Sequence, residues 1–300
     1  MTISAPIPLF INPAAGRGRA KRRIAAISRL LASSGVPNEC ITTTARGDIE
    51  RLIAEAADAG HRRIIVAGGD GTVHEAVNGI MQSDVPIDFG LVPTGTGNDF
   101  AGASSIPSHW EHAVALLADR LVSGAPAVPV DIGRCNDRYF ANGAGIGFDA
   151  TVSAIAARIR WPIGDLVYVV ALLRALRGRI ETPRLRLSFD DREIVGPATL
   201  AAFSNGPRVG GMFLIAPEAQ NNDGMLDLIY AAPVSRLRVL ALVPKLIRGR
   251  HMDAPEVEHH SLKSCTVVAH APLVAHLDGE IQPPQSRFDI ELLPGAVGLL

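Results

Sequence analysis

The sequence has three cysteines, and none lies close to another along the chain. Cys40, Cys135 and Cys265 lie far apart along the chain and form no CxxC motif. Disulfide scaffolds and structural zinc sites need cysteines in even or clustered sets. The sequence therefore argues against both and predicts buried thiols in a cytoplasmic protein.

The sequence also lacks an excess of positive charge and a long apolar run. Its 29 Lys and Arg residues are balanced by 30 Asp and Glu residues, so nucleic acid is not expected as a partner. The longest nearly apolar stretch, 166–173, is far shorter than the ~20 residues of a membrane-spanning helix. The first residues show no secretory pattern. We therefore expect contact with a membrane surface at most.

The first part of the chain alternates strand-like and helix-like segments, as open α/β sheets do. Glycine-rich connections separate these segments. The predicted strands are Pro8–Asn12, Arg63–Ala67 and Asp88–Pro93, and the predicted helices are Arg19–Ser33, Asp48–Ala59, Thr72–Met81 and His109–Ser123.

Strand signals dominate after a proline-containing linker at Ala125–Pro129. The predicted strands are Tyr139–Asn142, Arg184–Phe189, Thr199–Asn205, Leu226–Ala231, Cys265–His270, Leu273–Leu277 and Phe288–Leu292, and the predicted helices are Thr151–Gly178 and Val234–Arg248. We expect an α/β domain over 1–126 and a mainly β domain over 127–300. The last residues of the chain are a candidate addition to the first domain.

The motif Gly68-Gly69-Asp70-Gly71-Thr72 follows a buried strand and leads directly into a helix. Glycines allow close approach of the backbone to a ligand, and free N–H groups with the helix dipole favour phosphate. Thr72 and Glu75 have the spacing of a capping box. The alternative is a well-capped strand-to-helix turn, but an acid held between glycines serves no evident packing need.

Two further polar loops follow predicted strands in the same domain. Residues 94–99 (TGTGND) follow the strand that ends at Pro93, and residues 12–18 (NPAAGRG) follow the first strand. Ligands of open α/β sheets bind at the carboxyl ends of the strands. No GxxxxGK[ST] motif is present, so backbone amides, hydroxyls and Arg17 or Arg19 are the candidates to hold phosphate.

Three motifs in the second half carry alternative interpretations. Gly145, Gly147 and Ala150 match a GxGxxG/A dinucleotide fingerprint, although no second βαβ strand follows at the expected distance. Residues 221–227 (NNDGMLD) suit either a hard cation or a hairpin turn. Asp278 and Glu280, at a predicted strand end, suit either a general base or an ordinary turn.

In order, the motifs NPAAGRG, GGDGT, PTGTGNDFA, NGAGIGFDA, GGMFLIAPEAQNNDGMLDL and LDGE resemble those of the diacylglycerol kinase catalytic-domain family, especially its soluble bacterial lipid kinases. The resemblance covers nearly the whole chain. The GGDGT motif alone also occurs in NAD kinases and phosphofructokinases, whereas PTGTGNDFA followed by a late DGE favours lipid kinases.

The resemblance implies a nucleotide-binding α/β domain and a β-sandwich domain for the lipid substrate, with ATP bound between them. It implies that ATP contacts Asn12, Thr43, Gly68, Gly69, Asp70, Gly71, Thr72, Val73, His74, Glu75 and Thr96. It implies Glu280 as the general base and a structural Mg²⁺ near Asp223, with backbone oxygens of Gln220 and Met225.

These features predict an ATP- and Mg²⁺-dependent enzyme that phosphorylates a lipid hydroxyl, with a diacylglycerol-like acceptor. Asp70 is expected to orient the metal and phosphate, because phosphoryl transfer depends on positioning and charge neutralisation. The alternatives are a kinase of another small molecule, such as an NAD kinase, and a non-catalytic lipid- or nucleotide-binding regulator. The sequence does not decide between a monomer and a homodimer.

The segment 155–180 predicts the region of membrane contact. The segment has one acid, Asp165, and its basic residues lie on both sides of Trp161 and an apolar run. The basic residues are Arg158, Arg160, Arg174, Arg177 and Arg179. Basic residues near anionic lipid and an apolar face favour an interfacial helix. A helix packed on the β domain with an arginine-rich outer face is the alternative.

Overall fold

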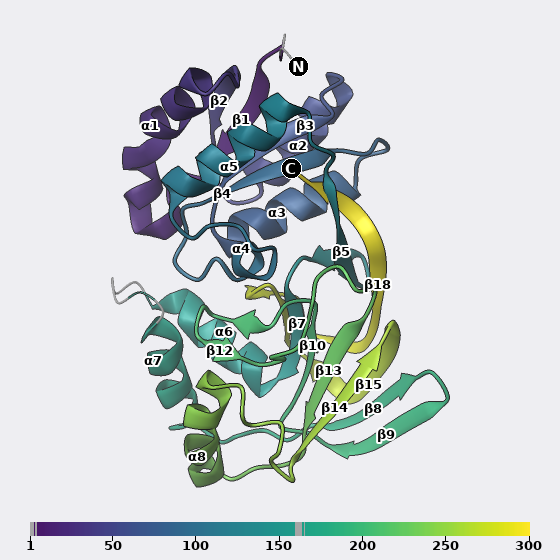
Figure 1. Ribbon diagram of the computed structural model, residues 1–300. Helices are drawn as coiled ribbons and strands as arrows, with labels where there is room; N and C mark the ends of the chain where they lie inside the picture. The colour runs from purple at the N-terminus through teal and green to yellow at the C-terminus, as the bar shows by residue number, and fades with distance from the viewer. Residues whose placement is uncertain (1–2, 4, 160–163, 165) are drawn as a thin grey trace. The chain divides into compact units, whose positions relative to one another are not determined.

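The computed structural model describes residues 3, 5–159, 164 and 166–300, apart from the side chains of Arg17 and Arg19 (Figure 1). The chain forms two compact units. Unit 1 comprises Met1–Val130 and Gly295–Leu300, and unit 2 comprises Asp131–Pro294. The chain passes from one unit to the other within β5 (Val128–Cys135) and again within β18 (Gln285–Leu299).

Unit 1 is built on a parallel sheet in the order β2-β1-β3-β4. The strands are β1 (Ile7–Ile11), β2 (Asn38–Thr42), β3 (Arg63–Gly68) and β4 (Asp88–Pro93). The end of β18 adds to the outer side of β4, with Gly298 opposite Asp88 and Leu299 opposite Phe89. β1, β3 and β4 are almost wholly buried, as strands of a sheet covered on both faces must be.

Helices cover both faces of this sheet (Figure 1). α1 (Arg19–Ser33) and α5 (Trp110–Ser123) pack together, and their apolar sides join β1 and β3 in one core. α2 (Asp48–Asp58) packs against α3 (Asp70–Met81). These two helices approach closely at Gly79, where a Cβ atom would lie 2.8 Å from the backbone oxygen of Glu50. The short elements η1 (Ala15–Gly18) and α4 (Asp99–Ala103) complete the unit.

Unit 2 contains two antiparallel sheets. One has the order β14-β13-β10-β7-β16-β17. Its strands are β7 (Gly143–Gly147), β10 (Leu200–Ser204), β13 (Leu226–Ala231), β14 (Val257–Leu262), β16 (Ala275–Leu277) and β17 (Glu280–Ile281). In the other, β15 (Ser264–Leu273) lies between β18 and β8 (Arg184–Phe189), and β9 (Arg192–Pro197) follows β8. β5 pairs with β18 and with β6 (Arg138–Phe140), and β11 (Arg208–Val209) pairs with β12 (Phe213–Leu214).

The two sheets of unit 2 enclose one apolar core, as in a β-sandwich. Phe203 and Leu228 contribute from one sheet, and Leu187, Val267 and Phe288 contribute from the other. All five side chains are fully buried or 1% exposed. Alternation of buried and exposed residues along β8 and β15 gives each strand one core-facing side. The predicted fold class, an α/β unit and a β-sandwich unit, is confirmed.

Three helices of unit 2 share a second apolar cluster. They are α6 (Phe148–Arg158), α7 (Leu166–Ala175) and α8 (Arg236–Ile247). No helix in the described part of the chain is long and apolar enough to cross a membrane.

The structure corrects the predicted helix Thr151–Gly178. Two helices, α6 and α7, stand there, and the prediction also falls on residues 160–163 and 165, which lie outside the described residues. β2, β9 and β14 were not predicted from the sequence. Each of these is a sheet edge with mostly exposed or half-exposed residues, so it lacks the apolar alternation that identifies a strand.

Candidate active site

Three polar loops lie at the carboxyl ends of neighbouring strands in unit 1. Asn12 follows β1, Gly69 follows β3 and Thr94 follows β4, and these strands are adjacent in the sheet. Backbone hydrogen bonds connect the loops: the Asn12 N–H donates to Ala67 O at 3.2 Å, and the Thr94 N–H donates to Gly68 O at 2.8 Å. The three loops predicted from separate motifs therefore form one edge.

The loops after β3 and β4 touch through their backbones. A Cβ atom on Gly69 would lie 2.8 Å from the Cα atom of Gly95, and one on Gly95 would lie 2.4 Å from the Cα atom of Gly69. The Asn98 side chain fixes this contact, because its Oδ1 accepts the Gly95 N–H at 3.0 Å. Glycine is required at both positions for steric reasons.

Side chains add two further links at this edge. Asn12 Nδ2 donates to Thr72 Oγ1 at 3.2 Å, which joins the first loop to the first turn of α3. Asp70 Oδ1 accepts the Phe100 N–H at 3.4 Å, which joins the start of α3 to α4. Of the predicted residues, Asn12, Gly69, Asp70 and Thr72 are therefore brought together.

The predicted capping box at Thr72 and Glu75 is wrong. α3 begins at Asp70, its N-cap is Gly69, and no side chain caps it. Glu75 Oε2 instead accepts the Ile49 N–H of α2 at 3.2 Å. The N-terminus of a 12-residue helix is thus left without a side-chain acceptor, in a glycine loop, which is a favourable arrangement for a phosphate group.

The other residues predicted to contact ATP have different surroundings. Val73 and His74 are buried, so their side chains belong to the interior. Thr43 is also buried, and its backbone N–H donates to Ile11 O at 3.0 Å. Thr96 lies half-buried in the loop after β4. The Arg17 and Arg19 side chains lie outside the described part of the chain.

Thr94 belongs to the predicted polar loop 94–99, but it was not among the residues expected to contact ATP. Its hydroxyl is buried and makes no hydrogen bond within the described residues. A buried polar atom without a partner is costly, and this one stands beside the glycine contact described above. The donors and the unpartnered hydroxyl of this edge fit a nucleotide phosphate chain.

The motif Leu277-Asp278-Gly279-Glu280 joins β16 to β17 in unit 2. Asp278 accepts three backbone N–H groups, from Ala141, Asn142 and Gly143, at 2.8, 2.8 and 3.0 Å. It therefore holds β7 and the turn together. Glu280 is the half-exposed first residue of β17.

The predicted metal residues lie in a turn before β13. Asp223 Oδ1 accepts the Met225 N–H at 3.0 Å, and Asp131 Oδ2 accepts the Gly224 N–H at 2.7 Å. Gln220 and Asp223 are exposed. A carboxylate with backbone carbonyls suits a hard cation such as Mg²⁺. Among the described residues no three His, Cys, Asp or Glu side chains form a metal cluster.

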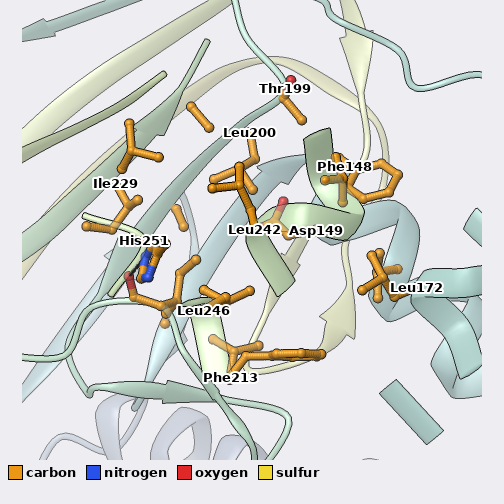
Figure 2. Close-up of a pocket in the computed structure, with 18 of the residues that line it drawn as sticks. Phe148, Asp149, Leu172, Thr199, Leu200, Phe213, Ile229, Leu242, Leu246 and His251 are labelled. Atoms are coloured by element: carbon orange, nitrogen blue, oxygen red, sulfur yellow. Dashed lines mark hydrogen bonds between the residues drawn. The ribbon is translucent and has the colours of Figure 1, made fainter. Parts of the chain in front are cut away.

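Unit 2 contains an apolar cavity that sequence reasoning missed (Figure 2). Its volume is about 1160 Å³, open space at its mouth included. Phe148, Leu172, Phe213, Leu242 and Leu246, contributed by α6, α7, β12 and α8, are among its lining residues. Because these residues are distant in sequence, no local pattern could have indicated the cavity.

Polar side chains also line the cavity, among them Asp149, His251, Glu256 and His276. His251 Nε2 bonds to Ile215 O at 3.0 Å, and burial lowers the pKa of the imidazole. His276 Nδ1 accepts the Gly279 N–H at 3.2 Å. Most of the lining residues are aliphatic or aromatic, and a mainly apolar wall with a few polar groups is the usual composition of a small-molecule site.

The glycine fingerprint at Gly145 and Gly147 does not form a dinucleotide-binding βαβ unit. Both glycines lie in β7, which pairs antiparallel with β10 and β16. At Gly147 a φ of 103° and the closeness of the Thr199 backbone explain the glycine.

Two family models match nearly the whole chain. The diacylglycerol kinase catalytic domain matches residues 6–135, and the YegS C-terminal NAD kinase beta sandwich-like domain matches residues 143–300. The chain belongs to the diacylglycerol kinase family. The family membership predicted from the motifs is confirmed, and with it the class of lipid kinase.

Similar proteins agree with this assignment. A diacylglycerol kinase of Mycobacterium tuberculosis is 35% identical over 98% of this lipid kinase and 94% of the relative, and one of Bacillus subtilis is 29% identical over 91% and 88%. A crystal structure of a diacylglycerol kinase from Bacillus anthracis superimposes with a TM-score of 0.77 at 26% identity, covering 98% of this chain and 96% of that one.

Proposed function

We propose that this lipid kinase transfers the γ-phosphoryl group of ATP to the hydroxyl of a diacylglycerol-like lipid. The apolar cavity of unit 2 is the observation that carries the proposal. Its wall is mainly aliphatic and aromatic, as in most pockets for small ligands, and acyl chains match such a wall. The glycine-loop edge of unit 1 supports ATP as the donor.

In this proposal, ATP phosphates bind the edge formed by Asn12, the first turn of α3 and Thr96. The uncapped start of α3 supplies N–H donors, and Thr72 and Thr94 supply hydroxyls. Mg²⁺ neutralises phosphate charge when bound. Asp70, the only carboxylate of the GGDGT motif, is its proposed orienting group.

Glu280 is the proposed general base for the acceptor hydroxyl. Asp278 accepts three backbone N–H groups and so has a structural role, and Glu280 is half-exposed at the start of the next strand. A second, structural Mg²⁺ is proposed at Asp223 with backbone oxygens of Gln220 and Met225. The oxygen donors in that turn support a hard cation.

We also propose that the protein works from the cytoplasm at a membrane surface. The predicted basic segment supports this, since Arg174, Arg177 and Arg179 are exposed. α8 supports it as well: Leu237 is 78% exposed and Leu240 43%. Residues 232–250 carry five basic side chains and no acid.

The proposal is tested with a phosphoryl-transfer assay on a panel of lipid alcohols, with Asp70→Asn as the matched variant. We expect Mg²⁺-dependent turnover of diacylglycerol by the wild type. We expect at least a hundredfold loss of activity in Asp70→Asn, with a melting temperature within a few degrees, because the change removes charge and keeps shape. Full activity of Asp70→Asn would refute the role of the motif, and turnover of NAD in place of lipids would favour the NAD kinase-like alternative.

A further inference from the structure

Two polar side chains meet at the wall of the apolar cavity and have no role in the chemistry proposed above. Asp149 lies in the first turn of α6 and His276 lies in β16, and both line the cavity. Asp149 Oδ2 and His276 Nε2 are 3.4 Å apart. His276 is 3% exposed. Buried polar groups are costly unless they are hydrogen-bonded, so this pair calls for an explanation.

The hydrogen bonds define which atoms remain free for a ligand. The Gly279 N–H donates to His276 Nδ1, so Nδ1 carries the lone pair and the proton is on Nε2. That Nε2 is buried and makes no hydrogen bond within the described residues. Asp149 Oδ1 accepts the Ala150 N–H at 2.8 Å, which holds the carboxylate with its other oxygen toward His276. An N–H donor is thus left at the cavity wall.

Gly145 makes space for this pair. A Cβ atom at that position would lie 1.8 Å from Asp149 Oδ2 and 2.5 Å from His276 Nε2. Support of the turn at Gly279 requires only the Nδ1 side of the ring. A histidine with a purely structural role would be expected to satisfy both nitrogens, as most buried polar atoms do.

We propose that His276 binds an ester carbonyl of the acceptor lipid through its Nε2–H, while the Gly279 N–H holds the imidazole ring at Nδ1. The inference rests on the proposed lipid kinase activity and deepens it. A diacylglycerol has acyl chains that match the apolar wall and ester carbonyls beside its free hydroxyl. The turn Asp278-Gly279-Glu280 holds the His276 ring through the Gly279 N–H and also contains Glu280, the proposed base. One turn therefore positions both the ester-binding group and the base.

The test compares an ester lipid with its ether analogue, which has the same chains and hydroxyl but no carbonyl. With dioleoylglycerol and dioleylglycerol in mixed micelles, we expect the wild type to favour the ester in kcat/KM by about 10- to 100-fold, since the ether leaves a buried donor without a partner. In His276→Phe the preference should fall to about threefold or less, mainly through loss of activity on the ester. His276→Gln retains an N–H donor and should restore part of the preference.

His251→Phe is the matched control, because that histidine lines the same cavity but uses its Nε2 on Ile215 O. It should leave the ester preference unchanged. Equal losses on both lipids in His276→Phe, or no ester preference in the wild type, would overturn the inference. Binding of both radiolabelled lipids without ATP gives a second readout. If no lipid is phosphorylated, the proposed function fails, while the ester-to-ether binding ratio of wild type and variants still decides the role of His276.

Discussion

Asp278 and Glu280 are separated by one glycine and have different surroundings. Three backbone N–H groups bind the Asp278 carboxylate, as in a structural turn. Its oxygens are engaged by β7 and the residues before it, which makes Asp278 a poor candidate to accept a proton. The sequence placed both residues at a predicted strand end, and the resemblance to lipid kinases implied Glu280 as the base; the hydrogen bonds add a structural role for Asp278.

Glu280→Gln tests the base assignment. The change keeps shape and hydrogen bonding but removes basicity, so we expect kcat to fall at least about a hundredfold while the KM for ATP changes little. Steady-state kinetics measure both values. Asp278→Asn serves as a comparison, and its expected main effect is a lower melting temperature. Wild-type kcat in Glu280→Gln would leave the glutamate as a turn residue.

His251 predicts a dependence of stability on pH. Burial lowers the pKa of this histidine in the folded state, whereas the unfolded chain retains the ordinary value of 6.5. Below that value the unfolded state binds a proton that the folded state resists, so stability falls as pH drops through 6.5 toward the folded pKa. Well above pH 6.5 the imidazole is neutral in both states, so His251 does not make stability depend on pH there.

The measurement is the melting temperature of wild type and His251→Gln at pH 7.5 and at pH 5.5. Glutamine keeps an N–H for Ile215 O but does not titrate. We expect the wild type to lose more melting temperature on acidification than the variant. An equal loss in both proteins would assign the acid sensitivity to other groups.

At the scale of elements, α8 has two apolar sides. Val239, Leu242, Val243 and Leu246 line the cavity, whereas Leu237 and Leu240 are exposed. The helix begins at the N-cap Ser235, whose hydroxyl accepts the Arg238 N–H at 3.2 Å. A helix that is apolar on its outer side and flanked by basic residues suits the surface of an anionic bilayer.

We expect the triple variant Arg236→Gln, Lys245→Gln and Arg248→Gln to bind anionic vesicles at least about tenfold more weakly, because each basic residue near such a surface contributes about 1 kcal/mol. Co-sedimentation with phosphatidylserine-containing vesicles measures this. The matched control is Arg184→Gln with Arg192→Gln, which removes exposed charge from the β8–β9 hairpin.

The same assay on Arg174→Gln, Arg177→Gln and Arg179→Gln tests the segment predicted from the sequence. A loss confined to this second triple would assign membrane contact to the α7 side and remove α8 from the surface. Unchanged binding in both triples would contradict contact through either helix.

The elements predicted best from the sequence are those in which buried apolar residues recur regularly or follow one another without interruption. β3 and β4 are buried apolar runs, and both were predicted within a residue. β7 has the sequence GAGIG and was not predicted, because glycine gives no strand signal. This segment is a strand because it pairs with β10 and β16 on its two sides. The Asp149–His276 pair could not be predicted, since the two residues meet only through the pairing of distant strands.

At the scale of the whole molecule, the cysteines report on the two units separately. Cys40 is exposed in β2 of unit 1, while Cys135 and Cys265 lie in the core of unit 2. Burial raises the pKa of both core thiols to about 12. Because the thiolate is the reactive form, these two thiols should be inert until unit 2 opens.

With a thiol reagent at pH 8, we expect one cysteine to react quickly in the native protein and two more only as urea unfolds unit 2. Peptide mass spectrometry identifies the modified positions. The native Cys40→Ser variant should not react with the reagent. Native modification of Cys135 or Cys265 as fast as that of Cys40 would contradict the burial of the sandwich core.

The pairing of β18 with β4 has a consequence for the order in which the units are completed during translation. Leu300 N donates to Phe89 O at 3.0 Å, so the sheet of unit 1 includes residues made after the whole of unit 2. At about 5–20 residues per second, the ribosome takes on the order of ten seconds or more between β4 and the end of β18. During that interval a nascent chain carries an open edge beside β4, which is the stage at which a chaperone or a neighbouring nascent chain would meet it.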